Sequence, residues 1–303
     1  MSAFLAGFGK ALPARVVTNA ELAHRVGKTA EWIESVSGIR ERRYADTETV
    51  SDLGSAAGHD CLERTGTPPA EIGLLIAASG SGARGFPGPA VEIAEKLGLG
   101  STPAIDIPIA SAGTLFGLAM AMQMVPVYGK ILLVGAETMS TVAGDDPNTA
   151  ILFGDGAGAA LITSDRGPWR LADAVLHSDG QYRDDLMFDG TLKMNGLNVI
   201  LHASRKMPAV IEELLARQGM KAADVGTFLV HQANLNLLTR VAKTLGVERE
   251  RFFSNIERYG NTSSASMLIA ASEWTDTNPA PAPVVFCAFG AGFHWGAVLA
   301  LPA

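Results

Sequence analysis

Apolar segments of the first half of the chain recur in the second half at a constant sequence separation. This repetition is the sequence feature that most restricts the possible folds. Residues 72–79 (IGLLIAAS) match 225–232 (VGTFLVHQ), and residues 131–136 (ILLVGA) match 284–289 (VVFCAF), each 153 positions later. Short apolar segments that alternate with helical stretches are typical of mainly parallel sheets covered by helices. The repetition therefore predicts two similar α/β halves, residues 1–165 and 166–303, whose sheets pack pseudo-symmetrically.

A candidate nucleophile lies between the repeated segments. Ser111 follows residues 102–109 (TPAIDIPI), expected to be a buried strand, and precedes residues 112–120 (AGTLFGLAM), expected to be a helix. A side chain at such a corner lies beside free N–H groups and the positive end of a helix dipole, which favour a developing anion. A lone serine here is more often an ordinary helix-start residue. The offset of the repeat maps Ser111 onto Ser264, so we expect the two corners to meet at a site.

Composition and charge exclude several classes of function. The chain has 303 residues, 48% of them apolar and 18% charged, which suits a well-buried α/β core. Its net charge of −7 argues against a general nucleic-acid binder, which needs a basic face. No apolar run reaches the roughly 18 residues of a membrane span, and the N-terminus lacks the features of a secretion signal. We therefore expect a cytoplasmic protein with no membrane segment and no nucleic-acid partner.

Other signals do not indicate a cofactor or a metal. Residues 80–85 (GSGARG) fit a dinucleotide-binding pattern, but no helix begins there and no acidic residue ends a second strand. Residues 154–158 (GDGAG) are interpreted as a tight turn between strands, and residues 166–200 as the least regular region. Cys61 and Cys287 lack metal-ligand spacing and are expected to be buried and unpaired.

Three further features resemble parts of an active site. His231 follows the expected strand 226–230, a placement that suits a crevice at the end of an open sheet. Asn261 lies at a turn that enters a helix. Residues 289–296 (FGAGFHWG) form a glycine loop that can bring N–H groups close to a ligand. Each feature alone also fits a structural role, as a half-buried histidine, a helix cap and a turn.

Together these segments resemble the β-ketoacyl-acyl carrier protein synthase III family of the thiolase superfamily. The resemblance spans almost the whole chain and rests on five ordered motifs: residues 32–42 (WIESVSGIRER), 153–159 (FGDGAGA), 231–234 (HQAN), 260–266 (GNTSSAS) and 289–296. It implies the five-layered αβαβα thiolase fold, a homodimer, and decarboxylating Claisen chemistry on acyl thioesters. Acyl-CoA or acyl-carrier protein would be the substrate, and no cofactor is implied.

The resemblance also implies roles for single residues. Position 111 would accept the acyl group, while His231 and Asn261 would help a malonyl thioester lose CO2 and stabilise the enolate. The N–H groups of Ser111 and Gly290 would form the oxyanion hole. Two such donors aimed at one oxygen stabilise a tetrahedral anion by several kcal/mol.

Serine at position 111 departs from the family, where this residue is normally cysteine. A serine hydroxyl does not ionise near a helix N-terminus as a thiol does, so it needs a general base, and His231 is the candidate. Four explanations stay open. Ser111 is a natural nucleophile of starter-unit or secondary-metabolite synthesis, or it was changed from cysteine to trap a ligand. Alternatively, the enzyme does not condense, or it is a silent subunit beside a cysteine-bearing synthase.

The substrate-gripping residues of the family are only partly present. Val36, Asn236 and Pro147 stand where the family usually has arginines that grip CoA or dock the carrier protein. The expected substrate-binding residues are therefore Trp32, Arg40, Phe86 and Asn234, with Phe86 reaching into the partner's acyl pocket. The alternative for Trp32 is a packing anchor. A basic patch for an acidic carrier protein is predicted at Arg240, Lys243, Arg249 and Arg251, the alternative being an ordinary solvated face.

Overall fold

The computed structural model describes residues 2–144, 146–278 and 281–303. The strands are β1 (Ala3–Ala11), β2 (Arg15–Thr18), β3 (Glu41–Tyr44), β4 (Leu74–Ala78), β5 (Ala104–Ile107), β6 (Lys130–Thr138), β7 (Asp155–Thr163), β8 (Trp169–Ser178), β9 (Leu186–Phe188), β10 (Leu192–Met194), β11 (Thr227–Val230), β12 (Val284–Gly290) and β13 (His294–Pro302). The α-helices are α1 (Asn19–Val26), α2 (Ala30–Ser37), α3 (Val50–Thr65), α4 (Pro89–Lys96), α5 (Gly113–Tyr128), α6 (Pro147–Ala150), α7 (Gly196–Arg217), α8 (Leu235–Leu245), α9 (Ile256–Tyr259) and α10 (Ser266–Thr277).

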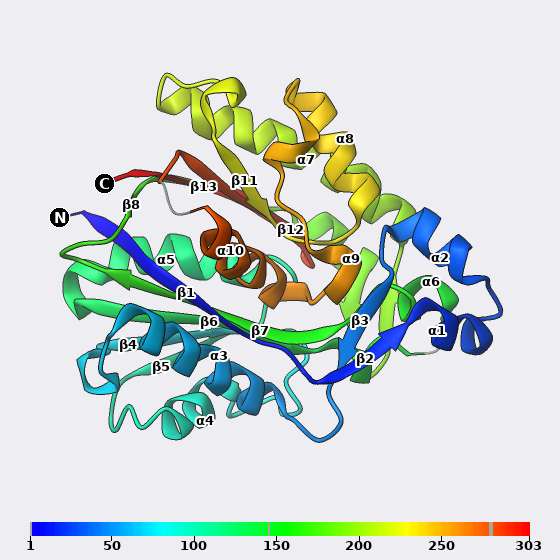
Figure 1. The fold of residues 1–303 in the computed structure, drawn as a ribbon, viewed down its shortest axis with the longest axis horizontal. Helices are drawn as coiled ribbons and strands as arrows, with labels where there is room; N and C mark the ends of the chain where they lie inside the picture. The colour runs from blue at the N-terminus through cyan, green and yellow to red at the C-terminus, as the bar shows by residue number, and fades with distance from the viewer. Residues whose placement is uncertain (1, 145, 279–280) are drawn as a thin grey trace.

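The main chain forms five layers (Figure 1). Helices α3 and α4 cover the outer face of the strands β1, β4, β5, β6 and β7, while α5 and α10 cover their inner face. The same two central helices contact β11, β12 and β13, whose other face is covered by α7 and α8. This arrangement confirms the αβαβα architecture expected from the sequence.

The strands of both halves join in one mixed sheet. Its order is β11-β12-β13-β8-β1-β7-β6-β4-β5, and the first residues of β8 pair with both β1 and β13. Strand pairing is parallel only for β4 with β5 and β6, and for β11 with β12. The expectation of mainly parallel sheets is therefore wrong, and the two layers of strands are joined at β1 and β8. Antiparallel strands need no helical crossover, and β12 and β13 are accordingly joined by residues 291–293 alone.

Helix α5 runs between the two sets of strands, and its sequence shows why. Its 16 residues (GTLFGLAMAMQMVPVY) include no charged residue, so the helix has no polar face to turn toward water. Gly117 lets the helix approach β6, since a Cβ at this position would lie 2.5 Å from Leu133 Cδ1. The two sets of strands cover most of this apolar helix, while Met120, Pro126 and Val127 stay exposed.

Two local predictions were wrong. Residues 154–158 do not form a turn, because Asp155 begins the nine-residue strand β7. Their glycines serve close packing instead: a Cβ at Gly158 would lie 2.7 Å from the main-chain nitrogen of Ile269 in α10. Residues 166–200 are also more regular than expected, since they contain the ten-residue strand β8 and the hairpin β9–β10.

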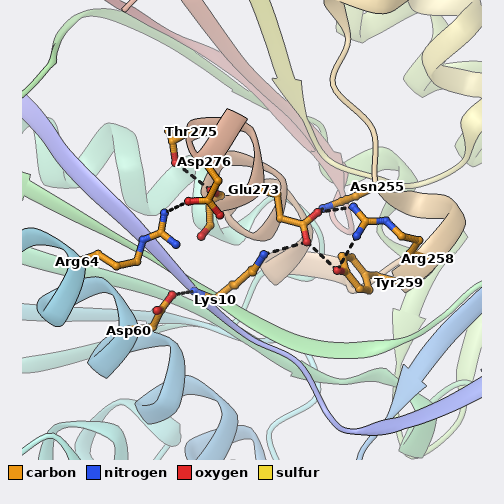
Figure 2. Close-up of polar contacts among 10 residues, drawn as sticks. Lys10, Asp60, Arg64, Asn255, Arg258, Tyr259, Glu273, Thr275 and Asp276 are labelled. Atoms are coloured by element: carbon orange, nitrogen blue, oxygen red, sulfur yellow. Dashed lines mark hydrogen bonds and ion pairs between the residues drawn. The ribbon is translucent and has the colours of Figure 1, made fainter. Parts of the chain in front are cut away.

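A buried carboxylate ties the central helix α10 to β1 and α9 (Figure 2). Glu273 accepts hydrogen bonds from Lys10 Nζ at 2.9 Å, Tyr259 Oη at 2.7 Å, Asn255 Nδ2 at 3.1 Å and Arg258 Nη2 at 2.6 Å. Its side chain is only 11% exposed. Desolvation acts to raise the pKa of Glu273, but the hydrogen bonds from Tyr259, Lys10 and Asn255 outweigh it and lower the pKa to about 2.

The low pKa of Glu273 predicts acid-sensitive stability. A carboxylate whose pKa falls on folding stabilises the native state above its unfolded pKa, and this contribution disappears as the pH falls. Between pH 6 and pH 3 the free energy of unfolding should therefore drop by about 2 kcal/mol on account of Glu273 alone. Urea unfolding of wild type and Glu273→Gln at both pH values measures this contribution.

The variant should be less stable than wild type at pH 6, with the difference shrinking at pH 3. Glu212→Gln, at an exposed position of α7, is the matched control and should follow wild type. A Glu273→Gln variant as stable as wild type at pH 6 would contradict the role of this cluster.

Candidate active site

Ser111 lies at a strained corner between β5 and α5. Its φ of +67° is in the left-handed region, which non-glycine residues rarely adopt. The side chain is 8% exposed, and the main-chain N–H donates to Ser263 Oγ at 2.9 Å. Ser263 is the other non-glycine residue of the described chain with a positive φ, at +47°. Two strained residues in direct contact indicate a constrained functional corner.

The two repeat-related corners meet as the sequence predicted. Ser264 Oγ donates to the carbonyl of Ile109 at 2.9 Å, and Thr114 Oγ1 donates to the carbonyl of Ser264 at 2.8 Å. Beneath them lies the fully buried Glu137, which accepts from the Ser264 main chain at 3.2 Å. Glu137 also accepts from Ser79 and Ser81 of the segment after β4. No signal in the sequence pointed to Glu137, because a single acidic residue at a strand end has no distinctive spacing.

His231 follows β11 and is held on two sides. Its main-chain N–H donates to Cys287 of the neighbouring strand at 2.9 Å, and its Nδ1 lies 2.7 Å from Ser266 Oγ. The side chain is 4% exposed. Burial lowers the pKa of His231 to about 4, while an interaction with the main chain of Ser263 acts in the opposite direction. The imidazole is therefore neutral at pH 7.

Asn261 is fixed at the opposite side of the same corner. Its main chain bridges to the segment before β7, donating to Leu152 at 2.8 Å and accepting from Gly154 at 3.1 Å. Its Oδ1 accepts from the Ser263 N–H at 2.9 Å. Since Oδ1 is engaged, Nδ2 is the donor that this side chain offers to a ligand.

Ser111, His231 and Asn261 line one cavity of about 70 Å³. Ser263 also lines it, and the rest of the wall is apolar. Its apolar residues come mainly from the β9–β10 hairpin, from α7 and from the ends of β6 and β12: Met139, Leu186, Leu192, Met194, Val199, Ala203, Met207 and Phe289. The cavity thus combines hydrogen-bonding groups near Ser111 with an apolar wall.

Gly290 is packed against the Ser111 corner. It ends β12, and a Cβ at this position would lie 2.2 Å from the carbonyl oxygen of Ala110 and 2.7 Å from the nitrogen of Ala112. Ala291 donates its N–H to the same carbonyl at 3.3 Å. Only glycine at position 290 allows the main chains to approach this closely, and its role as an oxyanion-hole donor stays a prediction.

The expected substrate-binding residues lie outside this cavity. Trp32 is half-buried beneath the ammonium group of Lys28, which lies 5.0 Å from the ring centroid, and the exposed Arg40 pairs with Glu34 at 2.9 Å. Asn234 has a structural role: Oδ1 caps α8 and Nδ2 donates to the carbonyl of Val36 at 2.9 Å. Phe86 protrudes, with 91% of its surface exposed.

The predicted basic patch divides into two kinds of residue. Arg240 and Lys243 are exposed on α8. Arg249 donates to the carbonyl of Phe252, and Arg251 donates to the carbonyls of Ala223 and Val225 at 2.8 and 2.9 Å. These two guanidinium groups therefore support the local main chain, and only the pair on α8 is fully presented to solvent.

Neither a metal cluster nor a membrane helix is found in the described residues. Across 2–144, 146–278 and 281–303, no three side chains of histidine, cysteine, aspartate or glutamate gather as metal ligands. No helix in the same ranges is both long and apolar enough to cross a membrane. Cys61 and Cys287 are buried and unpaired, as expected.

Sequence reasoning missed Ser263 and Ser266. Both lie within the 260–266 motif, whose unusual density of serines was the available signal. Their partners, the N–H of Ser111 and the ring of His231, belong to distant parts of the chain, so the motif alone could not show what these hydroxyls bind.

Comparison with known proteins identifies the family of this chain. The family model described as 3-oxoacyl-[acyl-carrier-protein] synthase III matches residues 105–180, and that of its C-terminal part matches residues 215–301. The β-ketoacyl-[acyl-carrier-protein] synthase III of Oleidesulfovibrio alaskensis is 36% identical, with 98% of each chain covered. That of Chelativorans sp. is also 36% identical, with 97% of each chain covered.

Two solved structures show the same fold. The 3-oxoacyl-[acyl-carrier-protein] synthase III from Aquifex aeolicus VF5 superposes with a TM-score of 0.95 at 32% identity, covering 99% of each chain. The priming β-ketosynthase of the R1128 polyketide pathway superposes with a TM-score of 0.91 at 31% identity, covering 99% of this chain and 96% of that one. The chain therefore belongs to the β-ketoacyl-[acyl-carrier-protein] synthase III family of thiolase-fold condensing enzymes.

Proposed function

We propose that the protein is an acyltransferase that receives an acyl group on Ser111 and condenses it with a decarboxylated malonyl unit. One observation carries the proposal: Ser111, His231 and Asn261, far apart in sequence, line one partly apolar cavity. Family membership supports condensation chemistry. A starter-unit or secondary-metabolite pathway fits the departure at position 111 and the arginines missing at positions 36 and 236.

The decarboxylation half-reaction uses two neutral donors. The carbon–carboxylate bond of the malonyl thioester breaks, CO2 leaves, and the electron pair forms an enolate whose charge rests on the thioester oxygen. Nε2–H of His231 and Nδ2–H of Asn261 would donate to that oxygen. In a buried site such hydrogen bonds are stronger than in water, because the surroundings do not screen them.

The acylation half-reaction is where Ser111 differs from a cysteine. Its Oγ would attack the thioester carbonyl, pass its proton to a base and expel the thiol, leaving an oxyester. The N–H of Ser111, now bonded to Ser263 Oγ, would turn to the tetrahedral oxyanion. An oxyester is less reactive toward a carbanion than a thioester, so condensation should be slower than with cysteine.

The substrate would be an acyl thioester carried by CoA or by acyl-carrier protein. The apolar wall around Met139, Met194 and Met207 suits an acyl chain rather than a charged group. Trp32 and Arg40 are the proposed contacts for CoA, and the exposed pair Arg240 and Lys243 is the proposed contact for an acidic carrier. No cofactor is required for these steps, and a cytoplasmic location stays a prediction of the sequence.

The alternatives differ in whether they need His231 and Asn261. Decarboxylation does not need the nucleophile, so a non-condensing enzyme that keeps this pair is the second candidate. A silent subunit beside a cysteine-bearing synthase would have no chemical need for the pair. A serine substituted for cysteine to trap an acyl group would give the same residue at position 111. The natural gene sequence at codon 111 separates that last case from the others.

Acylation of Ser111 is the direct test. Purified protein mixed with a panel of acyl-CoA and acyl-carrier-protein thioesters should gain the mass of one acyl group, which intact-mass spectrometry measures and peptide mapping assigns to Ser111. Ser111→Ala should gain none, and Ser111→Cys should be acylated faster because a thiolate is the stronger nucleophile. Absence of an adduct from every thioester, with wild type indistinguishable from Ser111→Ala, would end the proposal.

Decarboxylation provides a second test. His231→Ala or Asn261→Ala should lower the rate of CO2 release from malonyl-CoA by about 10²- to 10³-fold, because each removes one enolate donor. His59→Gln, an exposed histidine on α3, is the control and should match wild type. Since the pKa of His231 is about 4, its neutral form prevails and the rate should not fall between pH 8 and pH 5. A loss of activity centred near pH 6.5 would show that His231 is not buried as described.

A homodimer would cover the face from which Phe86 protrudes. This face also includes the exposed Val91 and the edge strand β5, whose outer side has no partner strand within the described chain. Sedimentation velocity should give twice the monomer mass, and Phe86→Asp should shift the distribution toward monomer. A wild-type monomer at micromolar concentration would contradict this assembly.

A further inference from the structure

The hydroxyl of Ser266 makes two contacts that together restrict where its proton lies. Ser266 is the first residue of α10, and its Oγ accepts the main-chain N–H of Gln232 at 3.1 Å. The same Oγ lies 2.7 Å from Nδ1 of His231. In the described part of the chain, these two nitrogens are the hydrogen-bond partners of Ser266 Oγ.

A count of protons separates the two possible tautomers of His231. A serine hydroxyl has one proton to donate and two lone pairs to accept with. The N–H of Gln232 is a fixed donor, so it takes one lone pair. If Nδ1 of His231 also carried a proton, Ser266 Oγ would accept twice and its own proton would have no acceptor among the described residues. A buried donor without an acceptor costs about 1–3 kcal/mol.

In the other arrangement every group is satisfied. Ser266 donates its proton to a bare Nδ1, and the ring proton lies on Nε2. The ring is neutral, and Ser266 holds it at Nδ1. Nε2 is therefore the nitrogen that can donate to a ligand in the cavity that His231 lines. The main chain of Ser263 also interacts with the ring, and this interaction raises the pKa of His231 against the effect of burial.

We propose that Ser266 is a positioning residue that holds His231 in the Nε2–H tautomer, and so commits this imidazole to donating a hydrogen bond rather than to accepting the proton of Ser111. This inference rests on the proposed function for its chemical meaning, but the tautomer itself does not depend on any substrate. In the resting enzyme His231 is then ready to donate to the enolate oxygen, but it is not ready to accept the proton of Ser111 during acylation.

The consequence concerns which half-reaction limits turnover. For His231 to accept the Ser111 proton, Nε2 must first lose its own, and Nδ1 must become the protonated nitrogen against the preference set by Ser266. Malonyl decarboxylation requires no such change. The wild-type enzyme should therefore release CO2 from malonyl-CoA faster than it acylates Ser111.

The tautomer can be observed directly in the unliganded protein. Histidine labelled with ¹⁵N gives separate signals for protonated and bare ring nitrogens, and long-range ¹H–¹⁵N correlation spectra assign them to Nδ1 or Nε2. At pH 7 His231 should show a bare Nδ1 and a protonated Nε2, with the His231→Gln spectrum identifying its signals. A protonated Nδ1 in the wild-type spectrum would overturn the inference, whatever the variants do.

Variants then test whether Ser266 is the cause. Ser266→Ala should give a mixture of both tautomers and a lower kcat for decarboxylation with little change in KM, while Ser266→Thr, which keeps a hydroxyl, should restore the Nε2–H form. Ser272→Ala is the matched control, because this buried hydroxyl lies on the same helix and has no hydrogen-bond partner in the described structure. A Ser266→Ala spectrum identical to wild type would overturn the role of Ser266.

The test distinguishes this inference from the proposed function. If the wild-type spectrum shows Nε2–H but the protein neither releases CO2 nor forms an adduct, the tautomer stands and the proposed function fails. If Ser111 is acylated as fast as malonyl-CoA is decarboxylated, the functional consequence drawn from the tautomer is wrong, even though the acyltransferase activity stands. Should Ser266→Ala not fold, the wild-type spectrum and Ser266→Thr still decide.

Discussion

The contact between the Ser111 corner and the 261–266 corner is the interaction on which the rest of the structure depends. Each corner comes from one half of the chain, and Thr114 and Ser264 hold them together by hydrogen bonds. Gly135 of β6 permits this approach, since a Cβ there would lie 2.4 Å from Thr114 and 2.7 Å from the carbonyl oxygen of Ser264. Nothing larger than hydrogen fits between the two halves at this point.

The same contact explains how strain is tolerated. A left-handed conformation costs a non-glycine residue of order 1–3 kcal/mol, and both Ser111 and Ser263 adopt it. Hydrogen bonds hold both residues in place, because the Ser111 N–H donates to Ser263 Oγ and the Ser263 N–H donates to Asn261 Oδ1. The corner thereby presents a hydroxyl and a carboxamide to one cavity. The buried Glu137 beneath it accepts from Ser264 and fixes the second corner at its base.

The candidate active site has polar groups but carries no charged side chain among the described residues that line it. The three side chains proposed for catalysis are neutral at pH 7, and no lysine, arginine, aspartate or glutamate of the described part of the chain lines the cavity. The structure thus supplies oriented dipoles rather than charges, which suits a reaction whose negative charge appears only in the transition state and enolate. A serine hydroxyl at position 111 does not become an anion by itself as a thiol can. In the proposed mechanism its acylation depends on whether His231 can accept a proton, which the proposed role of Ser266 disfavours.

Much of the fold and part of the site could be predicted from the sequence. The 153-residue repeat indicated the matching strands and the meeting of the Ser111 and Ser264 corners, because apolar periodicity reports which segments are buried. The motifs at 231–234 and 260–266 indicated which side chains to follow. The sequence misled at residues 154–158, where glycines that allow α10 to approach β7 resemble a turn, and it did not show that β1 and β8 join the halves into one sheet.

Only the tertiary structure decided which partner each polar group found. The hydroxyl of Ser266 reaches His231 from 35 residues away, and the N–H of Ser111 reaches Ser263 from 152 residues away. The apolar wall is assembled from the β9–β10 hairpin and α7, which the sequence had suggested were the least regular part of the chain. Local patterns encode burial and secondary structure because those depend on neighbours in the chain. The direction of a hydrogen bond, and with it the tautomer of a histidine, depends on atoms that only folding brings together.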